Sequence, residues 1–140
     1  RCVRITRAVE FSPSLRYALP GLSEAENRSR FGERARRHGH NYRLEVTLRG
    51  VPDPITGMVL DLKELQTVLD REVMARFDHR DLNEDTAFFE KRPPTPEHFA
   101  LVVAGLLREA LPEGLLDRIR LQQDGEHWVD VIEEPGAGAL

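Results

Sequence analysis

The stretch HGHNYRLEVTLRG, residues 38–50, decides the fold class of this chain. From His38 to Leu48 every second residue is a histidine, a tyrosine or an aliphatic residue, and the residues between them are mostly polar or charged. Because successive side chains of a β-strand point to opposite faces of its sheet, this alternation predicts a long strand with one buried face. The rest of the chain must then supply partner strands and a layer that covers this face.

A second strand is predicted at residues 2–11. Val3, Ile5, Val9 and Phe11 fall on one side of such a strand, although Arg7 interrupts that side. The residues from 12 to 37 contain prolines, glycines and many charges, so we expect a loop between the two strands.

Two helices are predicted after the turn-forming residues GVPDPITG. The first begins at Asp61, which together with Glu64 resembles a capping box, and it should end near Phe77. The second begins at Thr95, a capping hydroxyl, with Pro96 at its first helical position, and it should stop before residue 112. Apolar residues recur at helical spacing in both segments.

The end of the chain predicts a β-hairpin. Residues 119–123 and 126–132 read as short strands joined at Asp124-Gly125, a pair typical of two-residue turns. The order strand, strand, helix, helix, strand, strand indicates an α+β fold, an antiparallel four-stranded sheet with two helices on one face. We expect residues 1–134 to form a single domain and residues 135–140 to be disordered.

The composition excludes several classes of protein. The chain has 140 residues, one cysteine and a net charge of −4, which argues against a disulfide framework, a multi-cysteine zinc site and general nucleic-acid binding. Its longest apolar stretch, residues 100–107, is far shorter than the ~18 residues that a membrane span needs. We therefore expect a cytoplasmic protein that binds neither membranes nor nucleic acids.

Five arginines and one acid lie between Arg28 and Arg37. A run of this kind is usually a solvated, mobile loop. The alternative is a local anion site, because the guanidinium fork matches phosphate and carboxylate geometry. Both interpretations stay open from the sequence.

Two histidine motifs could support chemistry. His38 and His40 leave the same side of a strand and could converge on one metal ion, although two histidines can equally make ordinary hydrogen bonds there. Asp78 next to His79 could form a proton relay, although adjacent side chains often point apart. His98 and His127 are expected to be structural or exposed.

These segments together resemble one family. The residues SEAENRSRFG (23–32), HGHNYRLEVTLRGVPDPITGMVLDLKEL (38–65), FDHRDLN (77–83) and PTPEHFA (94–100) are similar, in this order, to 6-pyruvoyl- and 6-carboxy-tetrahydropterin synthases. The resemblance implies the tunnelling fold, whose subunits form a barrel of three and stack as a hexamer. It also implies lyase chemistry on dihydroneopterin triphosphate, with zinc as a Lewis acid.

The resemblance assigns roles to individual residues. It places zinc ligands at His38 and His40, a catalytic proton relay at Asp78 and His79, and pterin contacts at Thr95, Glu97 and Gln123. Three positions depart from the family: Leu15 stands where the third zinc histidine belongs, Arg34 where the catalytic cysteine belongs, and Gln123 where a glutamate anchors the pterin. Glu33, beside Arg34, is a candidate replacement base.

Two functions remain open: an enzyme of this family with altered chemistry, or a non-catalytic oligomer that binds a pterin- or purine-like ligand. Catalytic zinc needs about three protein ligands, so we predict that zinc binding is weak or absent. The ligand is expected to be a small pterin-like molecule. The long apolar strands predict a homo-oligomer, a trimer or a hexamer.

Overall fold

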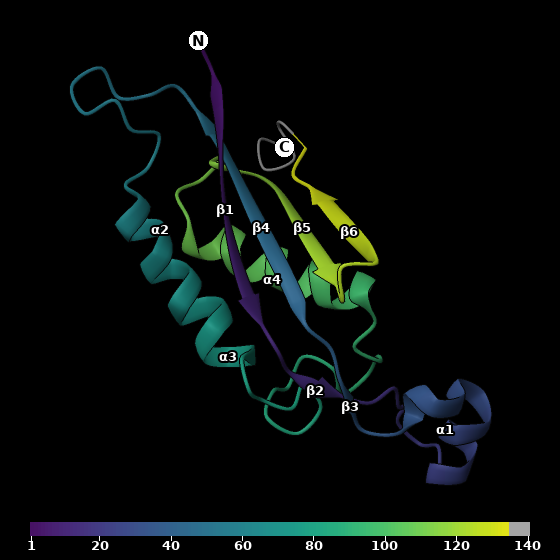
Figure 1. Ribbon diagram of the computed structural model, residues 1–140. Coiled ribbons are helices and arrows are strands. Elements are labelled where there is room, and N and C mark those ends of the chain that lie inside the picture. The colour runs from purple at the N-terminus through teal and green to yellow at the C-terminus, as the bar shows by residue number, and fades with distance from the viewer. Residues whose placement is uncertain (135–140) are drawn as a thin grey trace.

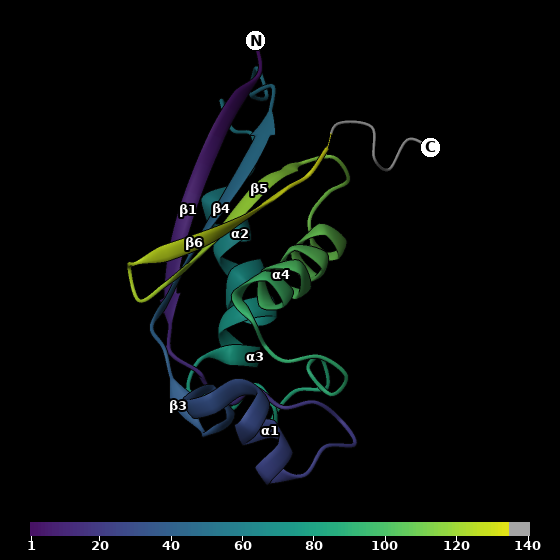
Figure 2. The ribbon, with the colours of Figure 1, turned by 90° about the vertical axis from the view of Figure 1, so that its right-hand side faces the viewer.

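A computed structural model describes residues 1–134, and the tail predicted to be disordered lies outside this part of the chain (Figure 1). Its main sheet has the strand order β1 (Val3–Phe11), β4 (Tyr42–Gly50), β5 (Leu116–Gln123) and β6 (His127–Ile132). Every neighbouring pair is antiparallel. The helices α2 (Leu62–Leu69) and α4 (Pro96–Ala110) cover one face of this sheet (Figure 2). The predicted α+β class is confirmed.

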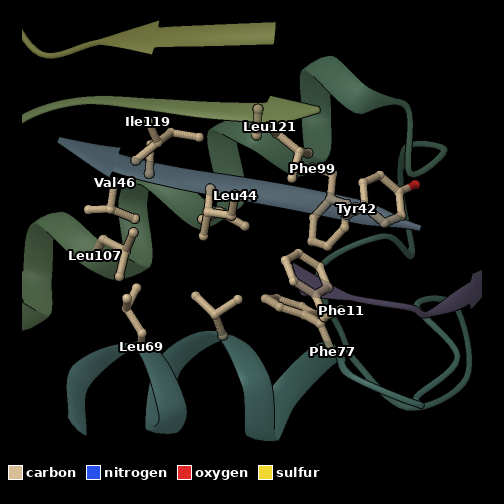
Figure 3. Packing of buried hydrophobic residues seen from close by; sticks show 14 of the residues in the cluster. Phe11, Tyr42, Leu44, Val46, Leu69, Phe77, Phe99, Leu107, Ile119 and Leu121 are labelled. Carbon is tan, nitrogen blue, oxygen red and sulfur yellow. The ribbon is translucent and has the colours of Figure 1, made fainter. Parts of the chain in front are cut away.

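The buried face of β4 forms the centre of the core. Tyr42, Leu44, Val46 and Leu48 all lie in the interior, at most 2% exposed. Figure 3 shows two parts of this core: aromatic rings at the end where β4 begins, and aliphatic side chains farther along the strand. The rings pack closely, and that of Tyr42 stacks on Phe11 with a centroid separation of 5.7 Å. The aromatic end of the core therefore lies next to the HGHNY segment, whose Tyr42 is part of it.

Both predicted helices form where the sequence places them. The first continues from α2 through a π-helical turn, η2 (Asp70–Met74), into α3 (Ala75–Phe77). Asp61 caps it by accepting a hydrogen bond from the Lys63 amide at 2.9 Å. Thr95 caps α4 by accepting one from the His98 amide at 3.1 Å. Among residues 1–134 no helix is both long and apolar enough to cross a membrane.

The predicted loop between the first two strands is wrong over much of its length. It contains the helix α1 (Glu24–Phe31), a 3-10 turn η1 (Gly32–Ala35) and the short strand β2 (Ser14–Leu15). A complete capping box stabilises the start of α1, because Ser23 and Glu26 each accept a hydrogen bond from the other's backbone amide.

The predicted single strand at residues 38–50 is interrupted near its start. His38 and Gly39 form the separate strand β3 (His38–Gly39), which pairs with β2, whereas Tyr42 begins β4 and pairs with β1. Between them, the Asn41 backbone hydrogen bonds to Asp124: its amide donates to the carboxylate at 3.0 Å and its carbonyl accepts from the Asp124 amide at 2.8 Å. The chain changes sheets here because these contacts replace strand pairing.

The closing hairpin also differs in detail from the prediction. Gln123 pairs with His127, so the turn has three residues between the strands rather than two. Asp124 and Gly125 both adopt positive φ, +53° and +74°. Asp124 tolerates this left-handed conformation because its carboxylate is tied back to the HGHNY segment.

Candidate functional site

A cavity of about 730 Å³ opens at the end of the main sheet where β4 begins and β5 ends. We call it the main cavity. Its walls come from the η1–β3 segment, the start of α4 and the β5–β6 hairpin. It brings together the predicted residues His38, His40, Thr95, Glu97 and Gln123. Segments that lie far apart in the sequence therefore meet in one place.

The two histidines of the main cavity lie edge to face, with ring centroids 4.8 Å apart. His38 Nδ1 lies 2.7 Å from the Arg36 carbonyl oxygen, and His40 Nδ1 lies 2.5 Å from the Asp124 carboxylate. Because both partners can only accept, each Nδ1 carries the proton and donates it. In the neutral rings Nε2 then has a free lone pair, available to a ligand or a hydrogen-bond donor.

Leu15 occupies the position of the third zinc ligand that the family resemblance expects. It pairs with His38 across β2 and β3 and is 0% exposed. Within residues 1–134, no three histidine, cysteine or acidic side chains are grouped so as to hold a metal ion. Zinc in a catalytic site takes three protein ligands, so the residues present do not fit it.

Hydrogen-bonding groups at the α4 side of the main cavity are free for a ligand. The exposed Glu97 carboxylate lies in the first turn of α4, where the positive helix end favours an anion. Gln123, a residue 6% exposed, ends β5 and lines the same cavity. Within the described chain neither side chain makes a hydrogen bond or ion pair. A carboxylate and an amide placed in this way can recognise the N–H groups of a flat heterocycle.

Two tyrosines in or next to the main cavity were not expected to take part in a site. Tyr17 lines the main cavity and packs edge to face against Phe31, with ring centroids 5.8 Å apart. Burial raises the pKa of the Tyr17 phenol, opposed by the nearby Arg34 charge and assisted by Glu97. Tyr42 packs 6.1 Å from His40, and its buried hydroxyl has no protein partner in residues 1–134. Burial raises the pKa of Tyr42 as well. Tyr17 belongs to no motif in the sequence, and Tyr42 was read only as a buried residue of the strand.

Asp124 positions the HGHNY segment and was also missed. Burial raises the pKa of its carboxyl, but hydrogen bonds from the Asn41 amide and His40 outweigh burial and lower it. The carboxylate therefore stays charged and orients the His40 ring. The sequence showed Asp124 only as a turn residue. Its role in orienting His40 depends on a contact between the β5–β6 turn and the HGHNY segment, which lie far apart in the chain.

Asp78 and His79 lie in a different cavity, of about 680 Å³, which also contains Ser12 and Gln122. Their side chains do interact, with Asp78 Oδ1 and His79 Nδ1 3.1 Å apart, and the Ser12 amide donates to Asp78 at 3.0 Å. His79 is 84% exposed and adopts a positive φ of +57°, a conformation that costs energy outside glycine. Neither residue lines the main cavity of the same chain.

Residues 28–35 of the arginine-rich segment are helical, in α1 and η1, whereas Arg36 and Arg37 follow these turns in an irregular stretch. Arg34, Arg36, Arg37 and Glu33 line the main cavity, whereas Arg28 does not. Glu33 lies 3.6 Å from Arg36, so this candidate base has a cationic neighbour.

Comparisons with known proteins point to one family. A family model described as 6-pyruvoyl tetrahydropterin synthase matches residues 4–137. The chain is 34% identical over 132 residues to 6-pyruvoyl tetrahydrobiopterin synthase of Homo sapiens, covering 92% of this chain and 91% of that one. It is 34% identical over 95 residues to a dihydroneopterin monophosphate aldolase of Pyrococcus furiosus, covering 67% of this chain and 76% of that one. Its fold matches the solved 6-pyruvoyl tetrahydropterin synthase of Caenorhabditis elegans with a TM-score of 0.86 and 31% identity, covering 96% and 97% of the two chains.

Proposed function

Since this chain belongs to the 6-pyruvoyl tetrahydropterin synthase family, we propose that it binds a pterin in the main cavity without using a bound zinc ion. The observation that carries the proposal is the pairing of Glu97 and Gln123 in one cavity, with their hydrogen-bonding groups free. The relatives are named for pterin chemistry, which supports the class of ligand.

The chemistry of the ligand matches these two side chains. A pterin presents adjacent N–H donors and a carbonyl oxygen along one edge of a flat bicycle. A carboxylate such as Glu97 can accept two of these hydrogens, and an amide such as Gln123 can both donate and accept. A cavity of about 730 Å³ falls within the ~300–1,000 Å³ usual for small-molecule sites.

The donor set argues against zinc-dependent chemistry in this chain. Of the three imidazole ligands expected from the family resemblance, two are present and the third is a buried leucine. Arg34 stands where the resemblance expects the thiol. His38 and His40 then act as hydrogen-bond acceptors toward the ligand through their free Nε2 atoms.

Lyase activity is a second candidate function, favoured by the contact between Asp78 and His79. A carboxylate 3.1 Å from His79 Nδ1 favours a proton on that nitrogen, which leaves Nε2 as the atom that can accept a proton from a substrate. Because this pair lies outside the main cavity of its own chain, a neighbouring copy would have to present it.

An incubation with dihydroneopterin triphosphate separates the two candidates. Fluorescence titration of the purified chain with pterin should show saturable binding, and mass analysis should show the triphosphate ester unchanged. Absence of saturable binding would contradict the proposal. Release of triphosphate at an enzyme-like rate, lost in His79→Ala, would establish the second candidate instead.

We also expect the protein to be a homo-oligomer, a trimer or a hexamer. Among residues 1–134 no strand pairs with the outer edges of β1 and β6 in the main sheet, and the apolar side chains of Val3, Trp128 and Ile132 on these strands are exposed. Long edges of this kind tend to associate unless the sheet closes into a barrel. Light scattering at micromolar concentration should give three or six times the monomer mass, and a stable monomer would overturn this expectation.

A further inference from the structure

Arg34 carries a positive charge into the main cavity that no carboxylate of residues 1–134 neutralises. Its two cavity neighbours are paired: Arg36 lies 3.6 Å from Glu33, and Arg37 lies 3.2 Å from Asp81. Arg34 instead donates its Nε–H to the Phe31 carbonyl oxygen at 3.3 Å. The charge of its guanidinium group is therefore left for another partner.

The position of this guanidinium group is set by the protein. Its central carbon lies 5.2 Å from the centroid of the Tyr17 ring, a cation–π contact. Tyr17 is itself held against Phe31 and is 8% exposed. Because Nε–H donates to the Phe31 carbonyl oxygen, the two terminal nitrogens of Arg34 remain available. They can donate to two oxygens of a carboxylate or phosphate.

The main cavity contains both a basic and an acidic group. Arg34 contacts the Tyr17 ring, and Tyr17, Arg34 and Glu97 all line the same cavity of about 730 Å³. Both charges are therefore presented to one small-molecule-sized space. A ligand with N–H donors at one end and an anionic group at the other would satisfy both.

We propose that Arg34 selects pterins whose ring carries an anionic substituent, a carboxylate or a phosphate, and holds that substituent by charge-assisted hydrogen bonds. The inference rests on the proposed pterin site and names the substrate class it takes. A guanidinium stays protonated at physiological pH, so Arg34 cannot remove a proton as a thiolate does. Its presence favours retention of the anionic group over its elimination.

Three probes test this inference: pterin, 6-carboxypterin and neopterin monophosphate, titrated by fluorescence into the full chain. Arg34→Met keeps an unbranched, flexible side chain and removes the charge and the fork of donors. It should weaken binding of an anionic probe about 10- to 100-fold, as expected for lost hydrogen bonds to a charged group, and change pterin binding less than about twofold. Arg34→Lys should restore part of the loss because it keeps the charge without the fork. Arg30→Met, in α1 outside the main cavity, is the matched control and should change nothing.

The outcomes separate this inference from the proposed function. A selective loss for 6-carboxypterin or for neopterin monophosphate identifies the substituent and supports the inference. Equal losses for all three probes, or none, overturn it while the pterin site stands. If the unmodified chain binds none of the three, both the pterin site and the role of Arg34 are refuted. Circular dichroism confirms that each variant is folded.

Discussion

Replacing Leu15 with histidine is expected to create a zinc site and to raise zinc affinity by at least about 100-fold. Loss of an outer-shell partner of a metal ligand typically costs about 10–100-fold in affinity, and a direct ligand should contribute at least as much. Leu15 lies directly opposite His38 in the β2–β3 pair. Opposed residues of antiparallel strands share one face with Cβ atoms about 5 Å apart. An imidazole at position 15 would therefore join His38 and His40, completing the three ligands that catalytic zinc takes. Metal analysis of protein equilibrated with zinc and then dialysed measures the effect.

Two further variants control this experiment. Leu15→Asn introduces a buried polar side chain of similar size without an imidazole, and it should not gain zinc. Combining Leu15→His with His40→Ala should abolish the gain, since only two imidazoles would remain. If the unmodified chain already retains about one zinc per chain, the conclusion drawn from the donor set is incorrect.

Removing the carboxylate of Glu97 is expected to weaken pterin binding by about 10- to 100-fold, the loss typical of hydrogen bonds to a charged group. Glu97→Ala deletes both acceptors, whereas Glu97→Gln keeps one oxygen and should show a smaller loss. The fold should survive, because an acid in the first turn of a helix contributes only about 0.3–1 kcal/mol. Fluorescence titration with pterin measures the affinities.

Glu109→Ala is the matched control for this prediction, because Glu109 lies exposed near the other end of the same helix. It should bind pterin as the unmodified chain does. Equal affinity of Glu97→Ala and Glu109→Ala would show that the pterin edge does not lie against Glu97, and the assigned orientation of the ligand would fail.

Much of the fold could be predicted because apolar residues recur at regular spacing along the strands and helices that bury one face. The alternation of Tyr42, Leu44, Val46 and Leu48 predicted a half-buried strand, and these residues do form the core face of β4. Thr95 and Pro96 marked the start of α4 correctly, since capping depends on a few adjacent residues. Local rules were sufficient for both elements.

The helix α1 was missed because its signal is not hydrophobic. Asn27 is its single buried residue, and the capping box formed by Ser23 and Glu26 sets its start. Tertiary contacts then anchor it, because the Asn27 side chain accepts a hydrogen bond from the Leu19 amide at 2.9 Å. A polar helix of this kind is hard to distinguish from a charged loop by periodicity.

The sequence suggested candidate residues for the site but not how they are arranged. Sequence motifs identified His38, His40 and Glu97, which do share the main cavity. The placement of Asp78 and His79 in another cavity could not be foreseen, because it depends on contacts of the segment after α3 with Ser12, which lies far away in the sequence. The contact of Arg34 with Tyr17 likewise depends on a turn of η1 that the sequence did not indicate.

A crystal structure of the full chain, grown with both pterin and zinc and measured at the zinc absorption edge, tests the central claim most directly. We predict density for pterin in the main cavity, with its amino-bearing edge against Glu97 and Gln123, and no anomalous peak between His38 and His40. Pterin bound elsewhere would contradict the assigned site. A fully occupied zinc ion held by the two histidines and contacting the pterin would contradict binding without zinc.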